Sequence, residues 1–301
     1  MRDLDKEAMA KGRVQRYLVA RPQLLDDGVH EDSIERRVKA GRWIRVQAGV
    51  YQVDHRPSSW EDDLMAATLA AGPGAFASHR AALVLWGLDG MSSAPVEITV
   101  PHSHNPVPEE TVLHRTRRPI DGTVLASVPV TSIERTLLDC ASTLGPLILT
   151  KAVESALRKR LTTEDQLHRF LKDSGGRGVK GTRLLRRVLN ARSSETTTGS
   201  GSETEALYHI RRSDLPVPVL QHRFVALDGT PIVPDFYWPL PNKAVEIDGI
   251  DAHDSADKLD HDLRRQNRLM DLGVELRRFS ARMIRREPDQ FIAELRRFIN
   301  L

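Results

Sequence analysis

Cysteine is almost absent from this chain of 301 residues, in which Cys140 is the single one. One thiol excludes an internal disulfide and a cysteine-rich zinc site, which fits a reducing compartment. Because Cys140 lies in an apolar, helix-like stretch, TLLDCAS, we expect an inert core thiol rather than a catalytic one.

Long apolar runs are absent as well. No segment approaches the ~20 apolar residues that cross a bilayer, and the least charged one, residues 64–78, is interrupted by Gly72-Pro73-Gly74. The first residues, MRDLDKEAMAKGR, carry charge where a secretion signal has an apolar run. We therefore expect a soluble, cytoplasmic protein with no membrane partner.

A large charge imbalance is also lacking, since 44 basic residues face 41 acidic ones for a net charge of +3. Any affinity for nucleic acid would have to come from local clustering of charge rather than from the field of the whole protein. The length suffices for two or three domains, each with a core of its own.

Residues 1–56 contain three short helical patterns followed by a pair of strands. The patterns cover residues 6–19, a segment starting at Pro22, and residues 33–40, where Asp32 and Glu35 have capping-box spacing and Gly41 is a C-terminal stop. The run WIRVQAGVYQV predicts two strands around a turn at residues 48–49. This order is that of a winged helix-turn-helix, a DNA-binding fold.

A basic cluster occupies the third helix and the residues that follow. Residues 36–45 hold five basic side chains and no acidic one: Arg36, Arg37, Lys39, Arg42 and Arg45. These side chains are typical of contacts to phosphates and guanine edges in a major groove, although charge runs also form plain solvated helix faces. The run IERRVKAGRWIRVQAGVYQV resembles the N-terminal domain of AbiEi-type antitoxins of type IV toxin-antitoxin systems, and this resemblance implies binding to double-stranded DNA.

Residues 57–192 alternate helical and strand patterns, so we expect an α/β middle domain. Its pieces GAFASHRAALVLWGL and PVTSIERTLLDCAS again resemble the AbiEi-like family. The histidines His102, His104 and His114 suggest a metal at first sight, but they lie among prolines without a Cys or Asp to complete a shell, so a solvated loop is the better interpretation. Ser78-His79 likewise lacks an acid for a hydrolase triad.

The segment SSETTTGSGS, residues 193–202, has no apolar residue and predicts a flexible linker. Ser202 and Glu205 then have capping-box spacing at the start of a helix. Glu205 is either that cap or an additional metal ligand.

Residues 203–301 predict a helix, a meander of three strands, a helix, a strand and a terminal helix. Within the meander, the stretch PIVPDFYWPLPNKAVEIDG places Asp235 in one strand, and Glu246 and Asp248 on one face of the next. Two neighbouring carboxylates on an apolar strand are costly unless a cation or a proton lies between them. Together with Asp235 they predict an oxygen site for a hard cation such as Mg²⁺.

The spacing of Pro-Asp, ten residues and Glu-x-Asp-Gly resembles the metal site of PD-(D/E)XK nucleases. It is most similar to the branch related to very-short-patch-repair (Vsr) endonucleases, and the similarity extends to Gln221 and to the run RRQNRLMDLGVELRRF. The resemblance implies an α/β/α core in which Asp235 and Glu246 hold Mg²⁺, with Mn²⁺ as a possible substitute, and Asp248 is a third acid.

The same resemblance gives roles to three further residues. His253 would bind water or metal or act as a general base, or else be structural; Arg265 and Gln266 would contact the scissile phosphate, or else simply favour the dipole of their helix. The general base stays unassigned, because Asp248 stands where related nucleases have a lysine.

Together these features predict an α+β multidomain protein. Its parts are a winged helix-turn-helix at residues 1–56, a middle domain at 57–192, a flexible linker at 193–202 and a Vsr-like PD-(D/E)XK nuclease domain at 203–301. The expected function is that of a metal-dependent DNA endonuclease. The alternative is a DNA-binding antitoxin or transcriptional repressor, with a toxin protein as partner and a nuclease fold that does not cleave.

Overall fold

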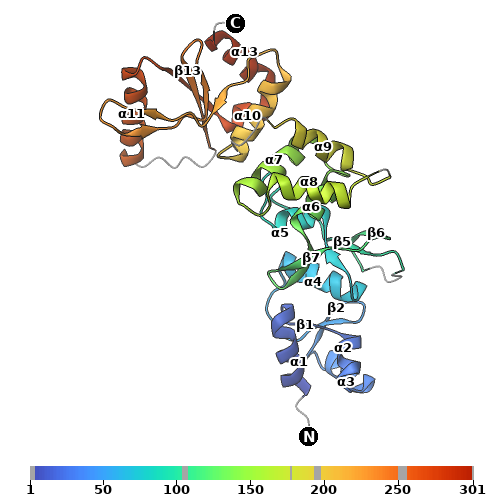
Figure 1. The fold of residues 1–301 in the computed structure, drawn as a ribbon. Coiled ribbons are helices and arrows are strands. Elements are labelled where there is room, and N and C mark those ends of the chain that lie inside the picture. Colours follow the sequence, from blue (N-terminus) through green and yellow to red (C-terminus); the bar gives the residue numbers. More distant parts are fainter. Residues whose placement is uncertain (1–3, 104–107, 177, 193–197, 250–255, 300–301) are drawn as a thin grey trace. The chain divides into compact units, whose positions relative to one another are not determined.

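The computed structural model describes residues 4–103, 108–176, 178–192, 198–249 and 256–299, and no side chain before residue 263 in the last of these ranges. The protein is a mixed α+β structure with several small sheets, as expected (Figure 1). It divides into two compact units, residues 1–144 with 165–185 (unit 1) and residues 145–164 with 186–301 (unit 2). No helix in the described ranges is long and apolar enough to cross a bilayer.

Unit 1 begins with three helices and a three-stranded antiparallel sheet of order β1-β3-β2. The elements are α1 (Leu4–Gly12), β1 (Leu18–Ala20), α2 (Arg21–Asp26), α3 (Glu31–Lys39), β2 (Ile44–Gln47) and β3 (Val50–Gln52). The fully buried side chain of Ile34 on α3 and that of Val19 on β1 share one apolar core.

Two local predictions for this region are wrong. The helix expected over residues 6–19 ends at Gly12, because residues 18–20 form β1 and pair with β3. Helix α3 begins earlier than expected, since the side chain of His30, and not that of Asp32, caps it by accepting the Asp32 amide proton.

The rest of unit 1 is built on a five-stranded mixed sheet of order β6-β5-β4-β8-β7. Its strands are β4 (Phe76–Ala77), β5 (Glu97–Pro101), β6 (Val112–Thr116), β7 (Gly122–Leu125) and β8 (Val128–Thr131). The helices are α4 (Trp60–Ala71), α5 (His79–Leu85), α6 (Ile133–Cys140) and most of α8 (Glu164–Asp173). Strands β5 and β6 run parallel, which places position 97 beside position 112.

Unit 2 has three layers around a four-stranded sheet of order β14-β13-β12-β9. The strands are β9 (Val219–Leu220), β12 (Phe236–Trp238), β13 (Lys243–Asp248) and β14 (Glu275–Ser280); β10 (Phe224–Val225) and β11 (Pro231–Ile232) form a separate pair. Helix α11 (Ala256–Asp271) lies on one face, and α10 (Gly201–Arg212) and α13 (Pro288–Ile299) lie on the other (Figure 1). The short α12 (Ala281–Arg286) and α7 (Pro146–Arg158) complete the unit. Helix α9 (Thr182–Asn190) belongs to unit 1 up to residue 185 and to unit 2 from residue 186.

Alternation along the strands explains the layers. Phe236, Trp238 and Val245 face the core under α10 and α13, whereas Tyr237 and Ala244 face the core under α11. The order of helices and strands follows the prediction for residues 203–301, with α12 and the split of the first strands into short pieces added.

The segment expected to be a linker is ordered in its second half. Residues 193–197 lie outside the described ranges, but Thr198 is buried and its hydroxyl hydrogen-bonds that of Thr204 at 2.6 Å. Helix α10 begins at Gly201 with Ser200 as N-cap, so the predicted capping box of Ser202 and Glu205 is wrong by two residues. Helix α7, counted above within the middle domain, packs on α10 in unit 2.

Candidate functional site

The carboxylates of Asp235 and Glu246 occupy opposed positions at one end of the β12 and β13 pair. Phe236 pairs with Val245, so Asp235 and Glu246 are the next residues along the two antiparallel strands. The backbone amide of Ile247 donates a hydrogen bond of 2.8 Å to Asp235 Oδ2. The apolar partners that bury these strands therefore bring the two acids together and fix the orientation of Asp235.

A third carboxylate approaches from helix α10, and it belongs to Glu203. Gln221 donates from Nε2 to Glu203 Oε2 at 3.1 Å and also hydrogen-bonds the carboxylate of Asp235. Glu203 is buried and also accepts the amide proton of Gly199. Gln221 thus links two acids.

Glu205, the residue predicted as an additional metal ligand, does not belong to this group. Its Oε2 lies 2.8 Å from Lys151 Nζ on α7 and 3.9 Å from Arg285 Nε. Residues two apart on an α-helix point about 200° apart, so one of the pair Glu203 and Glu205 faces the sheet and the other faces away. Glu205 is therefore held in a salt bridge to α7, and Glu203 is the acid of α10 that lies beside Asp235.

Burial perturbs all three acids in the same direction. Desolvation raises the pKa of Glu203, and the neighbouring charge of Asp235 raises it further. Desolvation likewise raises the pKa of Asp235 and that of Glu246, against the opposing effect of Arg265, while Asp248 adds repulsion to both. A cation or a proton among these oxygens is thus electrostatically favoured.

Two arginines already lie beside the acids. Arg265 on α11 donates to the carbonyl of Val233 at 2.6 Å, and the same Nη2 lies 2.8 Å from Glu246 Oε1 without hydrogen-bond geometry. Glu246 Oε1 is therefore a buried oxygen with no hydrogen-bond donor among the described residues. Arg278 on β14 holds both oxygens of Asp248, with distances of 2.5–3.1 Å.

These contacts decide how far the predicted metal site fits. Glu203, Asp235 and Glu246 offer carboxylate oxygens of the type that Mg²⁺ prefers. Glu246 Oε1 accepts no hydrogen bond from a described residue, although Arg265 Nη2 lies 2.8 Å from it. Asp248 is committed to Arg278, so its place as a third acid would require that pair to open. Within the described residues no three acids of this group lie within 4.8 Å of one another.

Two predicted residues of this site remain, His253 and Gln266. His253 lies outside the described residues. Gln266 on α11 is half-buried, and its side chain makes no hydrogen bond to a described residue.

The predicted DNA-binding residues divide into two groups. Arg36, Lys39, Arg42 and Arg45 have exposed side chains on α3, β2 and the turn between them. Arg37 is turned inward instead: it donates to Asp5 at 2.7 Å, and its guanidinium lies 5.4 Å from the centre of the Trp43 ring. The role expected for Arg37 is therefore corrected to a structural one.

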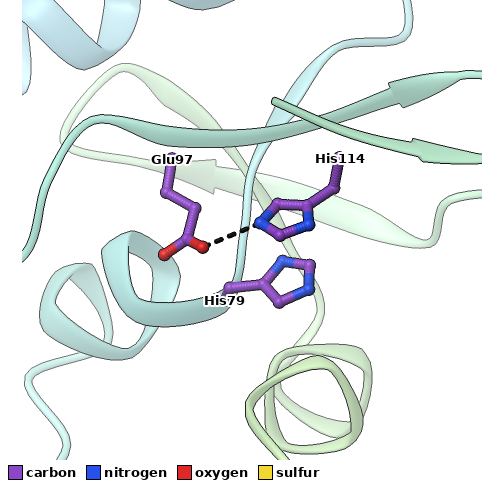
Figure 2. A group of neighbouring side chains, drawn as sticks. All are labelled: His79, Glu97 and His114. Atoms are coloured by element: carbon purple, nitrogen blue, oxygen red, sulfur yellow. Dashed lines mark hydrogen bonds and ion pairs between the residues drawn. The ribbon is translucent and has the colours of Figure 1, made fainter. Parts of the chain in front are cut away.

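A second polar cluster, in unit 1, escaped the sequence analysis. His114 Nε2 lies 2.7 Å from Glu97 Oε1, and the imidazole of His79 stacks on that of His114 with ring centres 3.6 Å apart (Figure 2). Glu97 is 1% exposed and also binds Arg80. His114 therefore lies on a strand beside a buried acid, and the solvated loop proposed for it is wrong. An acid inside the apolar run VEITV was the available signal, because a buried carboxylate requires a partner.

Comparison with known proteins adds no relative to this picture. No protein-family model matches the chain, and no curated protein sequence matches it.

Proposed function

We propose that the protein is a metal-dependent DNA endonuclease whose reaction site lies in unit 2. The observation that carries the proposal is a group of three carboxylates, those of the buried Glu203 and Glu246 and of the half-buried Asp235. Gln221 links Glu203 with Asp235, and Glu246 Oε1 has no hydrogen-bond donor among the described residues. The three-layer order of helix, sheet and helix supports the PD-(D/E)XK assignment.

Asp235 and Glu246 are the residues that would hold Mg²⁺ or Mn²⁺, with Glu203 as a further acid. When bound, such a cation supplies the charge that polarises a phosphodiester and activates water. The chain's own groups prepare the site: the Ile247 amide fixes Asp235, Gln221 orients the acids, and Arg265 contributes a cation beside Glu246. In this proposal Arg265 would bind a non-bridging phosphate oxygen.

Binding to double-stranded DNA is assigned to the start of unit 1. The helix, strand, two helices and hairpin of residues 4–52 support a winged helix-turn-helix, and four exposed cations, Arg36, Lys39, Arg42 and Arg45, lie on its third helix and in the segment that follows. Such contacts to the sugar-phosphate backbone position a protein on a duplex and make its affinity depend on salt.

The test is incubation of the purified protein with supercoiled and linear duplex DNA in Mg²⁺, in Mn²⁺ and in EDTA. Nicking or cleavage should require the metal and should be lost in Asp235→Asn and Glu203→Gln. The matched control is Asp271→Asn, which removes an exposed acid at the end of α11 and should cleave normally. Cleavage by Asp235→Asn at the wild-type rate would refute the site.

A second function, that of a DNA-binding antitoxin or repressor, is favoured by one observation. Arg265 and Arg278 already neutralise Glu246 and Asp248, as expected where acids serve folding rather than chemistry. Under this alternative the protein binds duplex DNA and a toxin partner but cleaves no DNA with either metal. The double variant Arg36→Ala with Lys39→Ala weakens DNA binding equally under both proposed functions.

A further inference from the structure

A pocket in unit 1 has a volume of about 1010 Å³. Strand β6 and helix α6 contribute to its walls, together with residues 117–119, 121, 173–175 and 178–180. Its size is at the upper end of small-molecule sites, roughly 1,000 Å³. None of the residues predicted for nuclease chemistry or DNA binding lines it.

Positive charge prevails on the lining. Five cationic side chains face three carboxylates there: Arg115, Arg117, Arg118, Arg135 and Lys180 against Asp121, Asp139 and Asp173. Asp139 is occupied by Arg135, whose Nε lies 2.9 and 3.0 Å from its two oxygens. Arg117 and Lys180 are exposed and have no ion pair with any residue in the described ranges. A concave surface of one charge sign raises the local concentration of ligands of the opposite sign.

His114 on the pocket lining is held in one orientation. Burial opposes the charge on Glu97, but the hydrogen bonds from His114 and Arg80 outweigh it, and the pKa of Glu97 is lowered. An ionised carboxylate only accepts hydrogen bonds, so His114 Nε2 carries the proton between them. The second ring nitrogen points away from Glu97 (Figure 2), which leaves it for another partner.

His79, also on the lining, has a strained backbone. Its φ is +51° at the junction of β4 and α5, a left-handed conformation that is uncommon for residues other than glycine and is concentrated at functional sites. The ring stacks on His114 and hydrogen-bonds Ser78 Oγ at 3.0 Å. These two contacts hold the imidazole against the ring of His114.

A metal ion does not account for this cluster, although ligand atoms of His79, Glu97 and His114 lie within 4.8 Å of one another. An imidazole binds a metal in its own ring plane, about 2.0–2.1 Å from the nitrogen for zinc. The two rings are 3.6 Å apart and only 17° from parallel. The planes of two rings so arranged do not meet within a metal–nitrogen bond length of both rings, so one ion cannot lie in both planes. In addition, His114 Nε2 is hydrogen-bonded to Glu97.

We propose that this pocket binds a phosphorylated small molecule of nucleotide size. Arg117 and Lys180 bind its phosphate groups, and His114, oriented by Glu97, contacts the ligand through its second nitrogen. A lone inorganic phosphate would leave most of the volume empty, whereas the half-buried ring of Phe170 on the wall offers a face on which a base stacks. The pocket is too small for duplex DNA, and the proposal does not depend on nuclease activity.

The experiment is titration calorimetry on the full-length protein in EDTA with ATP, AMP, pyrophosphate, inorganic phosphate and adenosine. ATP or AMP should bind more tightly than inorganic phosphate, and adenosine should not bind. Arg117→Ala with Lys180→Ala should weaken the nucleotide at least tenfold. The matched control is Arg169→Ala with Lys172→Ala, which removes two exposed cations of α8 that do not line the pocket and should bind as the wild type does.

Several results would overturn the assignment. They are equal affinity in both double variants, absence of nucleotide binding, and tighter binding of inorganic phosphate than of any nucleotide. Thermal midpoints of the two double variants close to that of the wild type exclude unfolding as the reason for weaker binding.

Discussion

Replacing His79 by asparagine is expected to remove a large part of the acid sensitivity of unit 1. Burial of the imidazole, followed by the nearby charge of His114, lowers the pKa of His79 from 6.5 to about 3, against the opposing effect of Glu97. Asparagine suits the site because it tolerates the left-handed backbone at φ +51° and retains a hydrogen-bonding group beside Ser78.

The direction of the pH dependence follows from whether the folded or the unfolded state binds the proton at a given pH. The unfolded chain binds it as the pH falls below 6.5, whereas the folded chain binds it only near pH 3. Between these values the free energy of unfolding falls with falling pH, at most by about 1.4 kcal/mol per pH unit for one group. From pH 7 to pH 5 the loss due to His79 alone amounts to about 2 kcal/mol.

The assay is urea unfolding at pH 7, 6 and 5, followed by a signal from unit 1, for the wild type, His79→Asn and His168→Asn. His168 is an exposed histidine on α8 in the same unit and serves as the control. His79→Asn should lose about 2 kcal/mol less than the wild type between pH 7 and pH 5. Equal losses in His79→Asn and the wild type would refute the reasoning, whatever the stability of the variant at pH 7.

Three further predictions concern buried charges. Asp62→Asn should destabilise unit 1 by about 3 kcal/mol, measured as a lower urea midpoint, because Asp62 is 3% exposed and binds Arg16 and Arg56. Arg37→Ala should cost about 1 kcal/mol of stability, whereas Arg36→Ala should leave the thermal midpoint unchanged and lower only the affinity for DNA and its salt dependence. Because burial raises the pKa of Glu246, the folded state in EDTA loses stability as the pH rises above 4.5; Glu246→Gln should flatten that loss and abolish any rise of the thermal midpoint with Mg²⁺.

Periodicity in the sequence was sufficient for most of the order of elements in unit 2, though not for α12 or for the short strands β9 to β11. Strand β13, KAVEID, alternates between two apolar cores, and the helical patterns on either side of it differ clearly from that period. The pairing of Asp235 with Glu246 followed from the same alternation, since a short hairpin fixes which positions face each other.

The features that the sequence analysis missed depend on pairing between strands that are far apart in the chain. Residues 18–20 continue a helical pattern, and only their pairing with β3 makes them a strand. Glu97 and His114 are far apart in the sequence and meet because β5 and β6 run parallel in adjacent positions. No local pattern specifies that neighbour, so a histidine among prolines was interpreted as a loop residue.

Helix α10 carries two acids near its start, Glu203 and Glu205, and only one of them lies beside Asp235. Ser200 with Glu203, and Ser202 with Glu205, have the same spacing in SGSETE, so local chemistry alone does not choose between them. The choice is tertiary: Thr198 and Thr204 hydrogen-bond in a buried position, and Lys151 binds Glu205. Once the helix begins after Ser200, Glu203 faces Gln221 and Glu205 faces α7. The packing of α10 on the sheet and on α7, rather than any local pattern, therefore decides which of the two acids lies beside Asp235.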